Sequence, residues 1–225
     1  MLYLIPTKRG LGVELWGAYE DLNNLYNIIS KFYNDENKSN IKGFESRDSI
    51  ISGISYEIRK AKDGNRLKRN SSHYSFEEYT YYGTQIFWVH FLFFLSSIKY
   101  NMRYNETNKF DISQVLLIEF WLEKAMNKYD LIGANDLSRF IDDAIYGAND
   151  YIYQYMRSIN IDYLSLGGGI KAFRNLPNLL KRGIFYTDEY NEYLEFLKDE
   201  STKHGCDISS LEVVDDEIDY INLKW

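Results

Sequence analysis

Two polar residues lie in apolar runs where a side chain could take part in acid–base chemistry. His90 lies in the most apolar stretch, residues 86–95, and Glu119 lies in the apolar run 116–121. In such runs each side chain needs a hydrogen-bond partner, and a histidine paired with a buried carboxylate is the kind of perturbed pair that enzymes use. A simpler interpretation is two unrelated residues, or a satisfied structural pair in the core. A site formed by His90 and Glu119 between helices is therefore an alternative and not the main hypothesis.

No pattern in the chain points to a metal or a cofactor. Asp142 and Asp143 are adjacent on an expected helix, so their side chains point about 100° apart and cannot converge on one metal ion. The glycine run at 167–169 lacks the spacing of a phosphate-binding loop. Cys206 is the only cysteine, which excludes an intramolecular disulfide and a cysteine-based metal cluster. We expect neither a metal site nor a bound cofactor.

Basic residues gather between positions 59 and 69, interrupted by Asp63. The six basic residues are Arg59, Lys60, Lys62, Arg66, Lys68 and Arg69. This basic cluster could contact phosphate or an acidic surface, although most such runs are solvated loops. Specific nucleic-acid binding requires more positive charge than a chain of net charge −7 carries, so we expect no specific nucleic-acid partner.

Negative charge gathers at the other end of the chain. Residues 186–225 contain twelve acids and three bases, a net charge of −9, which leaves +2 for the remaining 185 residues. An acidic end of this kind could bind a basic partner or the chain's own basic cluster, or it could simply favour solubility. We take four carboxylates as the candidate binding residues. They are Glu212, Asp215, Asp216 and Glu217.

The spacing of apolar residues predicts a mostly helical fold. Apolar residues recur three and four positions apart in seven segments, which is the period of an amphipathic helix. The expected helices are residues 18–33, 44–61, 84–104, 112–129, 137 into the 150s, 171–182 and 187–203. The segment 84–104 is apolar nearly all round, which places it at the centre of the domain.

Particular residues define the ends and faces of these helices. In the segment 112–129 the apolar set includes Leu116, Phe120 and Ala125. Either Asn135 or Asp136 is expected to cap the next helix, and the caps of the last expected helix are clearer. Thr187 precedes that helix and a glycine follows it, which is a typical start and stop.

The first 17 residues predict a β-hairpin. Residues 2–5 and 13–16 are β-prone, and proline and glycine between them supply the turn. The ranges 66–82 and 208–225 stay undecided, although residues 221–225 are β-prone and could add a C-terminal strand beside the hairpin. The expected class is α+β and predominantly α-helical, with an N-terminal β-hairpin followed by a multi-helix bundle. Because no linker interrupts residues 1–225, we expect a single domain.

Three stretches within residues 1–105 resemble an uncharacterised bacterial family, a domain of unknown function. They are the hairpin-to-helix run Gly12-Val13-Glu14-Leu15-Trp16-Gly17 with Tyr19-Glu20-Asp21-Leu22 and Leu25-Tyr26; the run Ser55-Tyr56-Glu57-Ile58-Arg59-Lys60-Ala61 with Asp63-Gly64-Asn65-Arg66; and Tyr81-Tyr82 with the apolar segment around Trp88. The resemblance implies the order of hairpin and then helices, and it transfers no catalytic residue.

The composition fits a soluble globular protein. Apolar residues make up 45% and charged residues 26% of the 225 positions, an ordinary balance. The stretch 86–95 is too short for a membrane helix, which needs about twenty residues, so we expect no membrane partner. Residues 1–12 lack the layout of a signal peptide, and one lone cysteine fits a reducing compartment. We therefore expect a cytoplasmic location.

The main hypothesis for function is a non-enzymatic protein-interaction module. In its most concrete form, the chain is an immunity-like protein whose acidic C-terminal surface binds a basic partner. One alternative is an enzyme that uses His90 and Glu119. Another is a structural or oligomer-forming protein, which a large exposed apolar patch would indicate. The sequence leaves the oligomeric state open.

Overall fold

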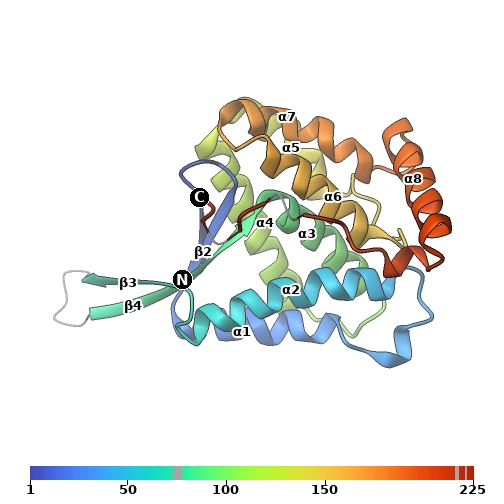
Figure 1. The fold of residues 1–225 in the computed structure, drawn as a ribbon. Helices are drawn as coiled ribbons and strands as arrows, with labels where there is room; N and C mark the ends of the chain where they lie inside the picture. Colours follow the sequence, from blue (N-terminus) through green and yellow to red (C-terminus); the bar gives the residue numbers. More distant parts are fainter. Residues whose placement is uncertain (73–77, 216–217, 221) are drawn as a thin grey trace.

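The computed structural model describes residues 1–72, 78–215, 218–220 and 222–225. It has the α+β, predominantly helical architecture that the sequence predicts. Figure 1 shows helices α1 and α2 along one side of the molecule and α5 to α7 along the opposite side, with α3 between them. A single hydrophobic cluster connects residues from the first strand to the last α-helix.

A four-stranded antiparallel sheet is built from the first 87 residues. Its strands are β1 (Tyr3–Pro6), β2 (Gly12–Gly17), β3 (Leu67–Ser72) and β4 (Glu78–Phe87), in the order β1-β2-β4-β3. The N-terminal hairpin is confirmed, with Tyr3 opposite Trp16. β3 and the start of β4 extend away from the helices as a second hairpin (Figure 1). This second hairpin occupies most of the range 66–82 that the sequence left undecided.

The prediction of a helix from residue 84 is wrong for its first four residues. Residues 84–87 complete β4, and Val13 of β2 pairs with Ile86 in the register of the sheet. Apolar periodicity over so short a stretch does not separate a buried strand from a buried helix. Because residues 84–87 pair with β2, they form a strand, and α3 begins at Trp88.

Eight α-helices lie in the described part of the chain. They are α1 (Tyr19–Ile29), α2 (Phe44–Lys62), α3 (Trp88–Met102), α4 (Lys109–Tyr129), α5 (Leu131–Asp142), α6 (Ile152–Ser165), α7 (Ile170–Leu180) and α8 (Asp188–His204). Every residue from Phe91 to Leu95 is buried, which confirms α3 as the central helix. None of the described helices is long and apolar enough to span a membrane.

The caps of α8 follow the prediction, whereas the start of α5 differs from it. The Thr187 hydroxyl accepts a hydrogen bond from the Tyr190 amide at 3.1 Å, and Gly205 ends α8 with φ +62°. α5 begins at Leu131, because the Asp130 carboxylate accepts a hydrogen bond from the Gly133 amide at 2.8 Å. Neither Asn135 nor Asp136 caps it, since both lie inside the helix.

The glycine run 167–169 has a structural explanation. All three glycines have positive φ, and the Gly169 amide donates to the Arg9 carbonyl at 2.6 Å. A Cβ on Gly168 would lie 2.5 Å from that same carbonyl oxygen. Glycine therefore lets this turn approach the β1–β2 loop closely. The Trp88 indole donates to the Gly10 carbonyl of the same loop at 2.9 Å.

The expected C-terminal strand is not found among the described residues of 208–225. The described residues of this segment form a 3-10 turn at Ile208–Ser210 and otherwise irregular backbone. The Trp225 ring stacks on Phe87 with ring centroids 4.4 Å apart. Ring stacking therefore holds the end of the chain, in place of pairing with the hairpin.

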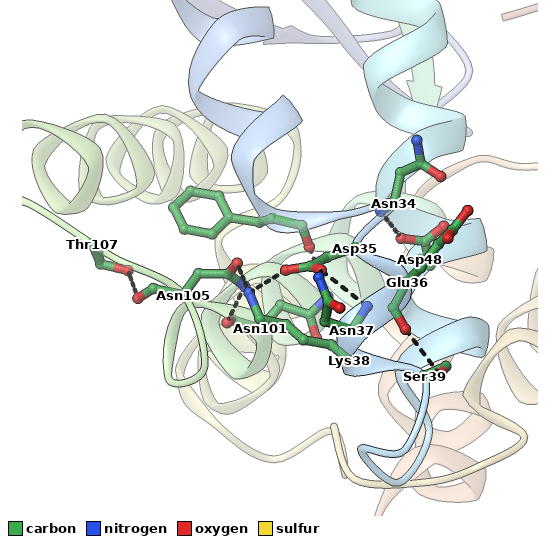
Figure 2. Close-up of polar contacts among 11 residues, drawn as sticks. Asn34, Asp35, Glu36, Asn37, Lys38, Ser39, Asp48, Asn101, Asn105 and Thr107 are labelled. Atoms are coloured by element: carbon green, nitrogen blue, oxygen red, sulfur yellow. Dashed lines mark hydrogen bonds and ion pairs between the residues drawn. The ribbon is translucent and has the colours of Figure 1, made fainter.

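Polar side chains hold residues 32–43 against the end of α3 (Figure 2). The Asn101 amide nitrogen donates to the Phe32 carbonyl at 2.8 Å, and the Lys38 ammonium contacts Asn105. The Asn34 backbone amide donates to the Asp48 carboxylate at the start of α2. These contacts give an irregular segment a fixed position between two helices.

Candidate interaction surface

The structure does not bring His90 and Glu119 together. The Glu119 carboxylate forms an ion pair with the Lys99 ammonium, which also donates to the Ile141 carbonyl at 2.6 Å. His90 lies nine residues before Lys99 on α3, a separation of about 13 Å along the helix axis. Glu119 therefore belongs to a contact among α3, α4 and the end of α5.

His90 lies in the first turn of α3, against the ring of Phe87 at 5.5 Å. Its Nε2 atom is buried and has no hydrogen-bond partner among the described residues. Burial and then the nearby charge of Arg157 lower the pKa of His90 to about 4, so the imidazole is neutral at pH 7. With no carboxylate bonded to it in the described structure, His90 lacks the partner that an acid–base pair requires.

The described residues also lack a cluster suited to a metal ion. No group of three or more His, Cys, Asp or Glu side chains in these ranges is placed to hold one. The charged and apolar surfaces are the remaining candidates for a contact site.

The four carboxylates of the predicted acidic C-terminal surface differ in their surroundings. Asp215 forms an ion pair with Arg157 of α6 and accepts a hydrogen bond from the Tyr220 hydroxyl at 2.9 Å. Its charge is therefore balanced within the chain by Arg157. Glu212 is exposed. Asp216 and Glu217 lie outside the described residues.

A more regular acidic surface lies on α8, which forms one outer end of the molecule (Figure 1). Asp188, Glu192, Glu195 and Asp199 are exposed, and their spacing of four, three and four residues places them along one face. Phe196, beside them, is also exposed. The sequence showed this charge but did not separate the ordered stripe on α8 from the irregular segment that follows.

The basic cluster lies at the end of α2, the turn after it and β3, where acids and aromatic rings of the same chain contact it. The Arg66 guanidinium forms two hydrogen bonds with the Glu57 carboxylate, at 2.7 and 2.9 Å, and Lys62 pairs with Asp63 at 3.5 Å. The other four cations lie over rings: Arg59 and Lys60 over Tyr56, Lys68 over Tyr82, and Arg69 over Trp16, Tyr3 and Tyr81. These contacts engage much of the cluster within the chain.

The outer face of α4 is apolar and exposed. Ile112, Leu116 and Phe120 lie four residues apart and are 44%, 56% and 46% exposed, and we call them the α4 stripe. Of the apolar set that the sequence indicates for this helix, Leu116 and Phe120 are exposed and Ala125 is buried. The apolar residues that the helix buries are Val115, Ile118, Leu122, Ala125 and Met126. α4 is therefore apolar on two faces, and only one of them packs against the core.

Residues at the edge of the α4 stripe are polar. Lys109, Ser113, Glu123 and Lys124 are exposed on the same helix, and the Lys124 ammonium lies 5.3 Å from the centroid of the Phe120 ring. An apolar centre with a polar rim is the usual layout of a protein–protein interface.

The fold and these surfaces define a helical protein with a small sheet, an unpartnered apolar helix face and segregated charge. A family model described as a domain of unknown function, DUF6904, matches residues 2–225. Because the match covers nearly the whole chain, the protein belongs to this family. Neither the comparison with curated proteins nor the comparison with solved structures found a match.

Proposed function

We propose that this protein is a non-enzymatic protein-interaction module and that the α4 stripe is its main contact surface. The observation that supports this most directly is the exposure of Ile112, Leu116 and Phe120 on three successive turns of one helix. Exposed apolar side chains that occur singly are common on soluble proteins. Adjacent ones with a polar rim mark a surface that binds another protein.

The geometry of the stripe indicates the kind of partner. Residues at positions i, i+4 and i+8 project from one side of a straight helix, so they fit an apolar groove or the apolar face of another helix. Phe120 also contacts Trp121 edge to face, with ring centroids 5.4 Å apart. Aromatic anchors of this kind contribute much of the binding energy in known interfaces.

The alternative of an enzyme has less support. His90 and Glu119 belong to different contacts, and the described residues assemble no nucleophile, base and orienting group. A neutral histidine without a carboxylate partner can still bind a ligand, but it does not define a reaction.

A second candidate function is supported by the acidic stripe on α8. Its four exposed carboxylates and the exposed ring of Phe196 would suit a partner that presents lysine or arginine, as an immunity-like protein requires. Such binding would weaken as salt is added, whereas binding through the α4 stripe would depend little on salt. A bacterial, cytoplasmic setting remains part of this proposal.

The test compares two double variants that each replace two exposed apolar side chains with serine. Leu116→Ser with Phe120→Ser removes two of the three side chains of the α4 stripe, and Leu166→Ser with Ile170→Ser is the control at another exposed site. Light scattering after size-exclusion chromatography measures self-association. Quantitative crosslinking and pull-down from the native host measure other partners.

We expect the α4 variant to lose the assembly or partner that the wild-type protein forms, while the control variant keeps it. If both variants keep the same partners and the same mass in solution, the α4 stripe is not the contact surface. A third variant then tests the acidic stripe: Asp188→Asn, Glu192→Gln, Glu195→Gln and Asp199→Asn together. Its matched control neutralises four exposed acids elsewhere: Glu20, Glu36, Glu106 and Asp136.

A further inference from the structure

A cleft of about 710 Å³ opens on a part of the molecule that α4 does not line. Its walls come from α2, the start of β3, the end of β4, the first turn of α3, α6 and the last residues of the chain. This volume falls within the range of about 300 to 1,000 Å³ that is typical of small-molecule sites. The cleft therefore has the size to hold a ligand independently of the proposed interaction surface.

Gly53 is the most informative residue of the cleft wall. It lies in the middle of α2, where glycine lowers helix stability relative to alanine. At Gly12 a Cβ would lie 2.0 Å from the Ile86 carbonyl oxygen, so packing within the chain requires glycine there. A Cβ on Gly53 would meet no atom of the described residues within 4 Å. Packing among these residues does not require glycine at position 53, and its absent side chain leaves the cleft open.

Flat aromatic side chains line the cleft at the end of β4. The rings of Phe87 and Trp225 stack at 4.4 Å with an angle of 15° between their planes, and the Tyr220 ring lies 6.4 Å from Phe87. Tyr153 of α6 also lines the cleft. Aromatic rings stack favourably on other flat π systems, so this lining favours a planar ligand over an aliphatic one.

The charged groups of the cleft are balanced by partners in the chain. Arg66 binds Glu57 with two hydrogen bonds, and the Thr84 hydroxyl donates to the same carboxylate at 3.1 Å. Arg157 is paired with Asp215. Each guanidinium among the described lining residues therefore already has a carboxylate partner, which weakens its attraction for a free anion. An uncharged ligand fits this arrangement best.

His90 supplies a polar atom that lacks a hydrogen-bond partner among the described residues. Its imidazole lines the cleft, and its Nε2 atom is buried without a hydrogen-bond partner among the described residues. A buried polar atom without a partner is costly. A ligand with hydrogen-bonding atoms at the edge of its ring could bond to the imidazole.

We infer that this cleft binds a small uncharged aromatic heterocycle of the size of a nucleobase or an indole. The ring stacks against the aromatic wall beside Phe87 and Trp225, and its polar edge contacts His90. The inference rests on the open wall at Gly53, the aromatic lining and the balanced charges. It does not depend on the α4 stripe.

The test uses adenine and indole as probes in isothermal titration calorimetry, with cyclohexanol as a probe of similar size that lacks a π face. We expect both heterocycles to bind the wild-type protein at least about tenfold more tightly than cyclohexanol. Gly53→Trp should abolish this binding, because the indole would project into the open space of the cleft. Gly53→Ala is the matched control and should retain it.

A second variant tests the role of His90. His90→Phe keeps a flat ring but removes both nitrogens, and it should weaken adenine binding by about two- to tenfold, the value of one hydrogen bond. Circular dichroism and a thermal melt establish that each variant is folded. If the wild-type protein binds the heterocycles no better than cyclohexanol, or if folded Gly53→Trp binds them as well as wild type, the inference is overturned.

Discussion

The guanidinium of Arg47 and the side-chain amide of Asn101 form a hydrogen bond of 2.6 Å in the interior of the protein, where both side chains are completely buried. Another nitrogen of Arg47 donates to the carbonyls of Lys42 at 2.9 Å and Gly147 at 2.7 Å. Burial lowers the pKa of Arg47 to about 10, so it is still a cation at neutral pH. Backbone carbonyls and one amide therefore bond two of its nitrogens, while Nη2 has no hydrogen-bond partner among the described residues. The Tyr100 ring, whose centroid lies 4.3 Å from the guanidinium carbon, covers the buried cation.

We predict that Arg47→Met destabilises the protein by about 3 kcal/mol, because it leaves the amide and two carbonyls buried without a donor. Urea denaturation measures the loss, and we expect one cooperative transition for residues 1–225. The control is Arg59→Met, an exposed arginine on the same helix, which should change stability by no more than about 0.5 kcal/mol. Equal effects of the two substitutions would contradict the role assigned to Arg47, and two separated transitions would contradict the single domain.

His90 should make the protein less stable in mild acid. Its pKa in the folded state is about 4, below the ordinary value of 6.5, so the unfolded chain takes up a proton first as the pH falls. Above pH 6.5 the histidine has no effect on the pH dependence of stability. Between pH 6.5 and 4 it should remove roughly 2 kcal/mol, after allowance for its partial exposure.

The measurement is urea denaturation across this pH range. His90→Gln should flatten the decline. A decline that persists in His90→Gln would show that other groups cause it.

A double-mutant cycle tests whether His90 and Glu119 act as a pair. The Glu119 carboxylate binds Lys99, which lies nine residues beyond His90 on α3. The effects of His90→Gln and Glu119→Gln on the free energy of unfolding should therefore add to within about 0.5 kcal/mol. The positive control is the cycle between Glu119→Gln and Lys99→Met, where the two side chains are in contact. A coupling of more than about 1 kcal/mol between His90 and Glu119 would restore the hypothesis of a shared site.

The sequence predicted those elements whose signals are local. The caps at Thr187 and Gly205 and the first hairpin depend on residues close together in the chain, and they were predicted correctly. The strand 84–87 was missed, because pairing with β2 outweighs an apolar pattern that also suits a helix. α5 follows α4 with only Asp130 between them, so no loop marked the boundary.

The surfaces were harder to predict for a related reason. Leu116 and Phe120 have the same apolar chemistry as the buried residues of α4, and only the position of the neighbouring elements decides which face is covered. The cleft combines residues near 53, 87, 157 and 225, which no periodicity links. Gly53, isolated inside a helical pattern, is a local signal that could have pointed to it, but no prediction was based on it.

Buried tyrosines should limit stability in alkali. Burial, followed by the neighbouring Tyr146, raises the pKa of Tyr190 to about 12, and burial also raises the pKa values of Tyr155 and Tyr163. Because these folded pKa values lie above the ordinary value of 10, the stabilising contribution is complete below pH 10. It is lost as the pH rises through 12, by roughly 2 kcal/mol for Tyr190.

Tyrosinate absorbance and urea denaturation between pH 9 and 12 check this prediction. Tyr190→Phe should reduce the loss of stability in this range, whereas Tyr186→Phe, at a strongly exposed ring, should not. If Tyr190 ionised near pH 10 in the folded protein, the assigned burial effect would be wrong.

Gly53→Ala should stabilise the protein, by about 0.5 to 1 kcal/mol. The substitution raises helix propensity in the middle of α2, and in the described part of the chain the added methyl group meets no atom within 4 Å. Gly43→Ala is the contrasting change, because Gly43 has φ +68° and a Cβ there would lie 2.5 Å from the Asn149 carbonyl oxygen. It should destabilise the protein by more than about 1 kcal/mol. Urea denaturation of both variants measures the difference. A loss of stability in Gly53→Ala would show that glycine at position 53 serves the fold itself, whereas a gain would leave an open cleft as the reason for its presence.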